Sequence, residues 1–150
     1  MKIFLDDLRT PPLPDETGPW VMCRSVADVL AIIYAGHQID LVSLDHDLGE
    51  GVASGYNLLC LIEARIGRAE WPFADTCTQV PYFQIHSDNP VGRKDMERAI
   101  RSIDRLLHRD SGSVLRLYYP GDEHQEFLTI EHVLGNQPLE DADPREEIVQ

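Results

Sequence analysis

Three carboxylates in this sequence directly follow short apolar runs. Asp6 and Asp7 come after the run 2–5, and Asp45 comes after the run 39–44. Two adjacent carboxylates repel each other unless a cation or hydrogen-bond donors compensate them. An isolated Asp-Asp pair would be explained by a solvated turn or a helix cap. Asp45 changes that preference, because carboxylate oxygens that converge from separate strands suit Mg²⁺ or Mn²⁺.

Two histidines lie at comparable positions. His46 stands between Asp45 and Asp47, and His86 follows the apolar run 82–85. Because an imidazole changes its protonation near neutral pH, the pair could serve as general acid and general base across a phosphodiester, beside Asp45. A lone histidine is more often structural or merely exposed, but two at adjacent strand ends favour catalysis. The remaining histidines have no comparable setting: His37, His108, His124 and His132.

A third polar cluster surrounds the expected start of a helix at Ser87, Asn89 and Arg93. Backbone N–H groups at a helix N-terminus attract anions, and an arginine there adds a bidentate phosphate donor. We therefore predict a substrate-phosphate site at these three residues, although Arg93 could equally be a solvated surface residue. The glycines within 49–55 either let backbone approach a ligand or form a flexible loop.

The elements that must position these residues alternate between strands and helices. The expected strands are 2–5, 20–23, 39–44 and 82–85, and the expected helices are 26–36, 56–67 and 90–108. Such alternation is typical of a parallel sheet with helices on its faces, in which ligands bind beyond the carboxyl ends of the strands. We therefore expect Asp6, Asp45 and His86 to meet at one edge of the sheet.

Other segments carry weaker patterns. The prolines within 9–19 rule out a regular helix there and predict a stiff connection. A terminal strand is expected at 114–119, and a strand or short helix at 127–133. We predict one α/β domain over residues 1–135 and a flexible acidic tail over residues 136–150.

Composition limits the partners. The formal net charge of −13 argues against a long nucleic acid, which normally requires clustered Lys and Arg, but a small anion held by local groups stays possible. No apolar run is long enough for a membrane span, so we expect a soluble, cytoplasmic protein. Three cysteines without C-x-x-C spacing, Cys23, Cys60 and Cys77, predict buried free thiols. A protein partner stays open.

The segments KIFLDD, DLVSLD and PYFQIHS resemble the strands of response-regulator receiver domains over residues 1–108. The resemblance implies a flavodoxin-like three-layer sandwich with a mainly parallel sheet, in which the Pro-rich segment replaces the first helix. It matches Asp6 and Asp7 to the metal-binding pair and Asp45 to the phosphoacceptor. His86 stands where receivers carry Ser or Thr, and no Lys-Pro follows a recognisable fifth strand, which argues against ordinary phosphorelay.

The segments LDDLRTPP, SLDHDLG and HSDNPVGR are more specifically similar to the receiver-derived cyclic-phosphate processing domains. This resemblance implies a hydrolase, a phosphoesterase that opens a cyclic phosphate on a nucleotide or an RNA end. His46 and His86 would share acid and base roles, Asp6, Asp7 and Asp45 would hold a divalent cation or orient the imidazoles, and Arg93 would bind phosphate. The alternatives are a catalytically silent module that binds a nucleotide or a partner protein, and aspartyl phosphorylation at Asp45.

Overall fold

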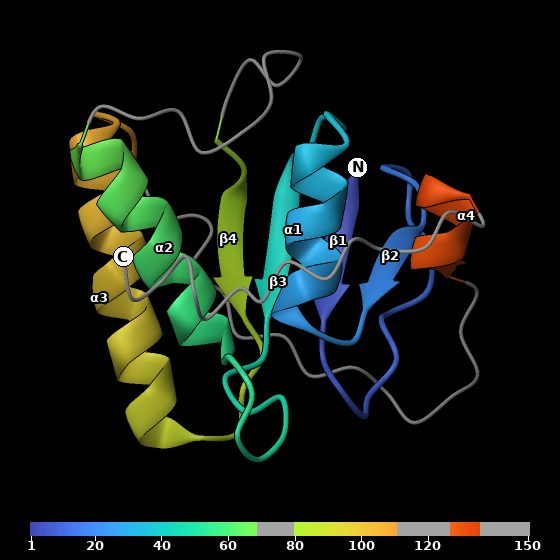
Figure 1. Cartoon of the computed structure of the whole chain (residues 1–150), viewed down its shortest axis with the longest axis horizontal. Helices are drawn as coiled ribbons and strands as arrows, with labels where there is room; N and C mark the ends of the chain where they lie inside the picture. Colours follow the sequence, from blue (N-terminus) through green and yellow to red (C-terminus); the bar gives the residue numbers. More distant parts are fainter. Residues whose placement is uncertain (69–79, 111–126, 136–150) are drawn as a thin grey trace.

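The computed structural model describes residues 1–68, 80–110 and 127–135, and within these ranges the chain forms an α/β fold around one parallel sheet (Figure 1). The strands lie in the order β4-β3-β1-β2-β5, and every neighbouring pair is parallel. Their bounds are Lys2–Leu5 (β1), Trp20–Cys23 (β2), Leu41–Leu44 (β3), Tyr82–Ile85 (β4) and Leu128–Thr129 (β5).

In the part of the chain that the structure describes, four helices accompany the sheet: α1 (Val26–Tyr34), α2 (Gly55–Gly67), α3 (Pro90–Leu106) and α4 (Ile130–Leu134). Each of the three longer helices begins at a side chain that satisfies a free backbone N–H group, as expected for N-caps. Ser25 accepts from Asp28 N, Ser54 forms a capping box with Asn57, and Asn89 accepts from Gly92 N before Pro90. The capping residues predicted for the first and third helices, Ser25 and Asn89, are confirmed.

The strands divide their side chains between two different faces, because successive residues of a strand point to opposite sides of the sheet. Helices α1, α2 and α3 pack in one core with alternate strand residues such as Ile3, Val42 and Phe83. The opposite side chains include Phe4, Trp20 and Met22, which form a second, smaller core. We call these the helix face and the second face.

The Pro-rich connection between β1 and β2 contacts the second face. Asp15 of this connection accepts a hydrogen bond from Lys2 Nζ at 3.0 Å, and the same ammonium lies 4.7 Å from the centroid of the Trp20 ring. Lys2 and Phe4 share one side of β1, so the connection lies where a receiver-like fold would place its first helix. The predicted replacement of that helix by a loop is confirmed.

The first four strands follow the flavodoxin-like order 2-1-3-4, so the predicted receiver-like fold is confirmed. The fifth strand differs, because β5 pairs with β2 instead of extending the sheet beyond β4. Segment 127–133 contains both the predicted strand and the short helix, as β5 and most of α4. The predictions for 114–119, for the tail 136–150 and for Cys77 lie outside the described residues.

The predictions for the cysteines and for the element boundaries can also be compared with the structure. Cys23 and Cys60 are free thiols; the predicted burial is confirmed for Cys23, but Cys60 is only partly buried. The third strand begins at Leu41, two residues later than predicted, and α3 ends at Leu106, two residues earlier. None of the helices in the described ranges has the length and apolar character needed to cross a membrane.

Candidate functional site

The carboxyl ends of the central strands lie level with one another. Leu5 of β1 is in register with Cys23 of β2 and Leu44 of β3, and Leu44 is in register with Ile85 of β4. The next residues along these strands are Asp6, Asp45 and His86, and backbone hydrogen bonds continue the ladder at 2.9 Å from Asp45 N to Leu5 O and from His86 N to Leu44 O. The prediction that these residues share one edge of the sheet is confirmed.

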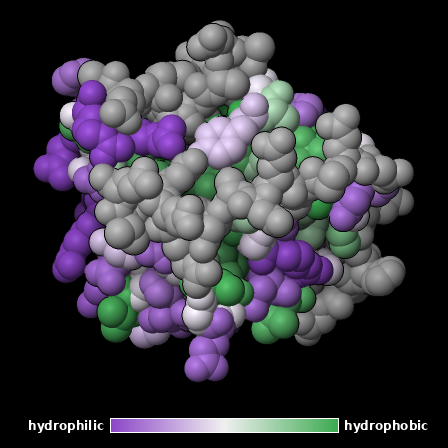
Figure 2. All heavy atoms as spheres, in the orientation of Figure 1, coloured by the Kyte–Doolittle hydropathy of each residue, from purple (hydrophilic) through white to green (hydrophobic). Residues whose placement is uncertain are grey.

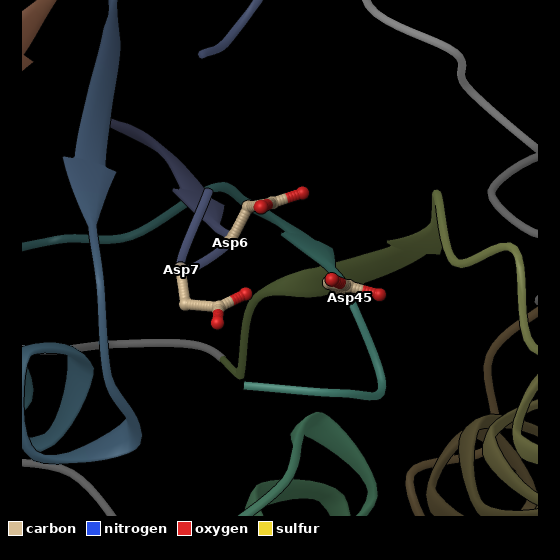
Figure 3. Close-up of side chains that lie close together, drawn as sticks. All are labelled: Asp6, Asp7 and Asp45. Carbon is tan, nitrogen blue, oxygen red and sulfur yellow. The ribbon is translucent and has the colours of Figure 1, made fainter. Parts of the chain in front are cut away.

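An open cleft of about 480 Å³ lies at this edge. Oxygens of Asp6, Asp7 and Asp45 lie within 4.8 Å of one another, and they come from the ends of the neighbouring strands β1 and β3 (Figure 3). The cleft-lining residues are Asp6, Asp7, Leu8, Arg9, Asp45, Asp47, Gly49, Asp88 and Asn89. The acidic cluster predicted from the sequence therefore forms part of a real concave site.

Asp6 is almost completely buried and is held by four hydrogen bonds. Its Oδ1 accepts from the backbone N–H groups of Leu8 and Arg9 at 2.9 and 2.7 Å, and its Oδ2 accepts from Arg9 Nε at 2.8 Å and pairs with His86 Nε2 at 3.1 Å. Burial alone would raise the pKa of Asp6, but these bonds favour the carboxylate and lower its pKa well below the usual range. Asp6 is therefore a firmly ionised group at neutral pH.

Asp45 has the opposite electrostatic setting. Burial and the negative charge of Asp6 raise the pKa of Asp45, and the hydrogen bond from Ser87 and the charge of Arg9 oppose that rise only in part. Its backbone is fixed by α2, because a Cβ at Gly55 would lie only 2.1 Å from the Asp45 carbonyl oxygen. A cation in the cleft would therefore favour the ionised form of Asp45.

Arg9 is the cation that the structure places among these carboxylates. Its guanidinium contacts Asp6 at 2.8 Å, Asp88 at 3.3 Å and Asp45 at 3.5 Å, and it donates to the carbonyl oxygen of His86 at 3.1 Å. Arg9 thus links the ends of β1, β3 and β4. Two-point binding of a phosphate by this guanidinium would require it to exchange its longer contacts, those with Asp88 and Asp45.

Arg24 supports the same loop from the end of β2. Its Nη1 donates to the carbonyl oxygens of Asp6 and Arg9 at 3.2 and 2.9 Å. These bonds fix the backbone that carries the Asp6 carboxylate and the Arg9 guanidinium. Four strand ends therefore contribute to one constellation.

His86 is enclosed in the second face. It is 0% exposed, its ring stacks on Phe4 at 4.1 Å between centroids, and both of its nitrogens are engaged, Nδ1 with Ser43 Oγ at 2.8 Å and Nε2 with Asp6 Oδ2 at 3.1 Å. Gln84 donates to Ser43 Oγ at 3.1 Å. A neutral imidazole with its proton on Nε2 satisfies every group, since Ser43 then donates to Nδ1 and His86 donates to Asp6.

His46 lies on the helix face at the edge of the site. Its Nδ1 pairs with Asp47 Oδ1 at 2.9 Å, its ring lies near Tyr56 at 6.5 Å between centroids, and a Cβ at Gly92 would come within 2.5 Å of it. The side chain is 22% exposed and is not among the cleft-lining residues, whereas Asp47 is. Asp47 therefore connects His46 to the wall of the cleft.

The predicted phosphate site divides into separate groups. Asn89 lines the cleft, caps α3 and donates to Asp47 Oδ2 at 3.2 Å. Ser87 is buried and accepts from Asn89 N at 3.2 Å. Arg93 is half-buried on α3 and is not among the residues that line the cleft. Arg9 thus occupies the place for which the sequence suggested Arg93.

A family model described as the cyclic-phosphate processing receiver domain matches residues 1–102. The chain belongs to this family. No curated protein and no solved structure matches the chain. The match covers all cleft-lining residues of this cyclic-phosphate processing receiver domain and most of α3, and it ends before β5. The unusual position of β5 therefore lies outside the matched region.

Several residues of the receiver domain's site were not recognised from the sequence. The spacing of Arg9 from Asp6 carried a signal, because an aspartate at a strand end often accepts from backbone N–H groups two and three residues later, which brings the third residue close. Ser43 carried a different signal. It is a polar residue inside an otherwise apolar strand, and a buried hydroxyl there requires a hydrogen-bond partner.

Proposed function

We propose that the chain is a phosphoesterase that opens a cyclic phosphate on a nucleotide or an RNA end, with the acidic cleft as its active site. Membership of the cyclic-phosphate processing receiver family supports this class of substrate. The observation that carries the proposal is the convergence of Asp6, Asp7, Asp45 and Arg9 on one open cleft. In this proposal the carboxylates would hold a cation and Arg9 would bind an anion, and a metal-assisted phosphoester reaction uses both.

A divalent cation fits the residues present. Asp6, Asp7 and Asp45 offer carboxylate oxygens within 4.8 Å of one another, and burial together with the negative charge of Asp6 raises the pKa of Asp45. Oxygen ligands of this kind are those that Mg²⁺ takes in proteins. When bound, the ion would supply Lewis-acid stabilisation of charge on the phosphate oxygens.

In the proposed reaction a water oxygen forms a new bond to phosphorus and one of the two ring P–O bonds breaks. The water gives up a proton, and the departing alkoxide gains one. Arg9 binds a non-bridging phosphate oxygen, while His46 and Asp45 are the candidates for moving the protons. Both nitrogens of His86 are already bonded, so His86 acts through Asp6 as a positioning residue.

A turnover screen tests this proposal and separates it from the rival, a silent binding module. Cyclic mononucleotides, cyclic dinucleotides and RNA with 2′,3′-cyclic phosphate ends are each offered in 100-fold excess, with and without Mg²⁺, and the products are followed by ³¹P NMR. The enzyme is expected to convert the whole excess of at least one substrate. Stoichiometric binding of a cyclic phosphate without conversion would favour the silent module. Acid-stable, base-labile phosphate on the protein after treatment with a phosphodonor would indicate phosphorylation of Asp45 instead.

A further inference from the structure

The outer side of α3 carries a row of four exposed basic residues, Lys94, Arg98, Arg101 and Arg105, which we call the α3 stripe. Their spacing of four, three and four residues places them within roughly 60° of arc on an ideal helix. The buried residues of α3 centre on the opposite side: Gly92, Met96, Ala99, Ile100, Ile103 and Asp104. The stripe therefore points away from the core.

The charge of the stripe is unlike that of the whole chain. The sequence has 13 basic and 26 acidic residues, yet four of the 13 share this one side of α3. The acidic residues of α3, Asp95, Glu97 and Asp104, fall outside the arc of the stripe, although Arg98 contacts Asp95 at 3.7 Å. Figure 2 shows hydrophilic side chains along the side of the molecule where α3 lies.

The stripe ends in a second hollow. A cleft of about 440 Å³ at the carboxyl end of α3 is lined by Arg101, Asp104, Arg105, Arg109 and Asp110. Arg109 is fixed there, since its guanidinium donates to the carbonyl oxygens of Val80 and Pro81 and lies 4.2 Å from the Tyr82 ring. Arg109 also pairs with the buried Asp104, so three arginines and two aspartates line the hollow and its formal charge is only weakly positive.

The other end of the stripe lies near the acidic cleft. Asp88 and Asn89 line that cleft, and α3 begins at the next residue, Pro90. Lys94 follows after about one helical turn, and the rise of 1.5 Å per residue carries the stripe about 16 Å further to Arg105. A chain of phosphates that ended in the acidic cleft could therefore continue along the α3 stripe.

We propose that the α3 stripe binds the phosphate backbone of a single RNA strand whose cyclic-phosphate end occupies the acidic cleft. The proposal rests on the proposed function and narrows its substrate from a free nucleotide to an RNA end. A terminal 2′,3′-cyclic phosphate requires a vicinal 2′-hydroxyl, which RNA has and DNA lacks. Regularly spaced cations on one side of a helix complement such a polyanion, and the negative charge elsewhere would repel the strand from other faces.

Salt dependence of RNA binding tests the stripe without relying on catalysis. A 12-nucleotide RNA with a 3′-hydroxyl end is titrated with the full chain by fluorescence anisotropy between 50 and 200 mM NaCl. Four phosphate contacts give a slope of roughly −2.8 for log K against log[salt], so affinity should fall about 50-fold over this range. Replacing all four residues of the stripe by Gln should bring the slope close to zero. An unchanged slope in this variant would overturn the proposal.

Two controls separate local charge from net charge and from folding. The triple variant Arg98→Lys, Arg101→Lys, Arg105→Lys keeps the charges and should keep the salt slope. Leu13→Glu changes the net charge by the same amount as Arg101→Gln but on an exposed residue of the Pro-rich connection. It should leave the slope unchanged, whereas Arg101→Gln should reduce it by about 0.7. Equal effects of Leu13→Glu and Arg101→Gln would contradict a local binding surface.

The same samples distinguish failure of the stripe from failure of the proposed function. Hydrolysis of a cyclic mononucleotide without salt-dependent RNA binding would overturn the stripe alone. RNA binding with the predicted slope but no hydrolysis of any cyclic phosphate would remove the function and leave the backbone-binding surface. If an acidic peptide binds the stripe and RNA does not, the occupant we propose is wrong.

Discussion

His46 lies two residues after β3 and His86 lies directly after β4, yet the two imidazoles have different surroundings. His86, after β4, is fully buried, stacked on Phe4 and hydrogen-bonded through both nitrogens. His46, after β3, pairs with one carboxylate, rests against Gly92 and keeps 22% of its side chain exposed. The enclosed ring is suited to hold a neighbour in place, and the open ring is suited to exchange protons with solvent or substrate.

The alternation of side chains explains the difference. His86 continues the side of β4 that carries Gln84, which is the second face, whereas His46 continues the side of β3 that carries Leu44, which is the helix face. A residue's position after a strand therefore predicts which edge of the sheet it reaches. Whether its number along the strand is odd or even predicts which face of the sheet it joins. In this molecule the face decides whether the imidazole is enclosed or open.

Replacing each histidine in turn tests the different roles with the largest expected effects. We expect His46→Ala and His86→Ala each to lower turnover by roughly 10²- to 10⁴-fold, the usual scale for losing proton transfer or the geometry that supports it. Only His86→Ala should also destabilise the fold, by about 1–3 kcal/mol, because it removes a buried ring stacked on Phe4 and its hydrogen bonds to Asp6 and Ser43. Turnover assays and urea unfolding measure the two effects. Equal losses of stability would contradict the different roles.

Arg9 and Arg93 test which arginine binds the substrate phosphate. Arg9→Gln should lower turnover by roughly 10²- to 10³-fold, the scale for losing a charge-stabilising donor, because Arg9 stands among the cleft carboxylates. Arg93→Gln should lower turnover by less than about tenfold and act mainly on KM, since Arg93 does not line the cleft. Steady-state kinetics on a cyclic-phosphate substrate would contradict this account if the Arg93 variant were the more impaired.

Ser43 tests the positioning role of His86 with a smaller expected loss. Ser43→Ala removes the hydroxyl that donates to His86 Nδ1. It should reduce turnover by roughly 10- to 100-fold, the scale for losing a residue that holds a site side chain in its orientation. Ser43→Thr keeps the hydroxyl and should restore activity. ¹⁵N NMR should report the Nε2–H tautomer of His86 in the wild type and a changed tautomer population in Ser43→Ala. An unchanged tautomer in the alanine variant would remove this role.

The two buried carboxylates should affect stability with opposite signs. In metal-free buffer at pH 7, Asp6→Asn should lower the free energy of unfolding by about 1–3 kcal/mol, because the folded state favours the Asp6 carboxylate. Asp45→Asn should raise that free energy by about 0.5–2 kcal/mol, because burial and Asp6 disfavour its ionised form. Urea unfolding at several pH values measures both variants.

The pH dependence of these two effects follows from the pKa shifts. The pKa of folded Asp6 is lowered, so its stabilisation is present above the unfolded value of about 3.9 and is lost progressively as pH falls below that value towards the lowered folded pKa. The pKa of folded Asp45 is raised, so its cost appears as pH rises through the unfolded value and is absent at lower pH. Both differences from wild type should therefore shrink toward acid. A growing difference at low pH would contradict them.

The fold could be predicted because local signals agreed. Short apolar runs that end in polar residues, together with Ser25 and Asn89 as helix caps, defined the alternation of strands and helices. The position of β5 could not be predicted in the same way, because a strand of two residues, Leu128–Thr129, has too little pattern to select an edge.

The site could be predicted as far as its backbone positions allowed. Asp6, Asp45 and His86 meet because parallel strands end level, which the sequence indicated. The choice of Arg9 over Arg93 depended on a local turn that carries Arg9 back over the Asp6 carboxylate, and strand and helix periodicity does not report such a turn. The net charge of the chain also gave no sign of the α3 stripe. It sums over the whole surface, whereas a ligand contacts only one part of it.

The most direct test of the central claim is the turnover of a cyclic-phosphate substrate by Asp45→Asn beside Glu16→Gln. Both variants remove one carboxylate, but Asp45 lines the acidic cleft and Glu16 lies exposed on the Pro-rich connection. With the substrate in excess, followed by ³¹P NMR, Asp45→Asn should lose at least about 100-fold in turnover number and Glu16→Gln should match the wild type. Full turnover by a folded Asp45→Asn variant would contradict the assignment of this cleft as the active site.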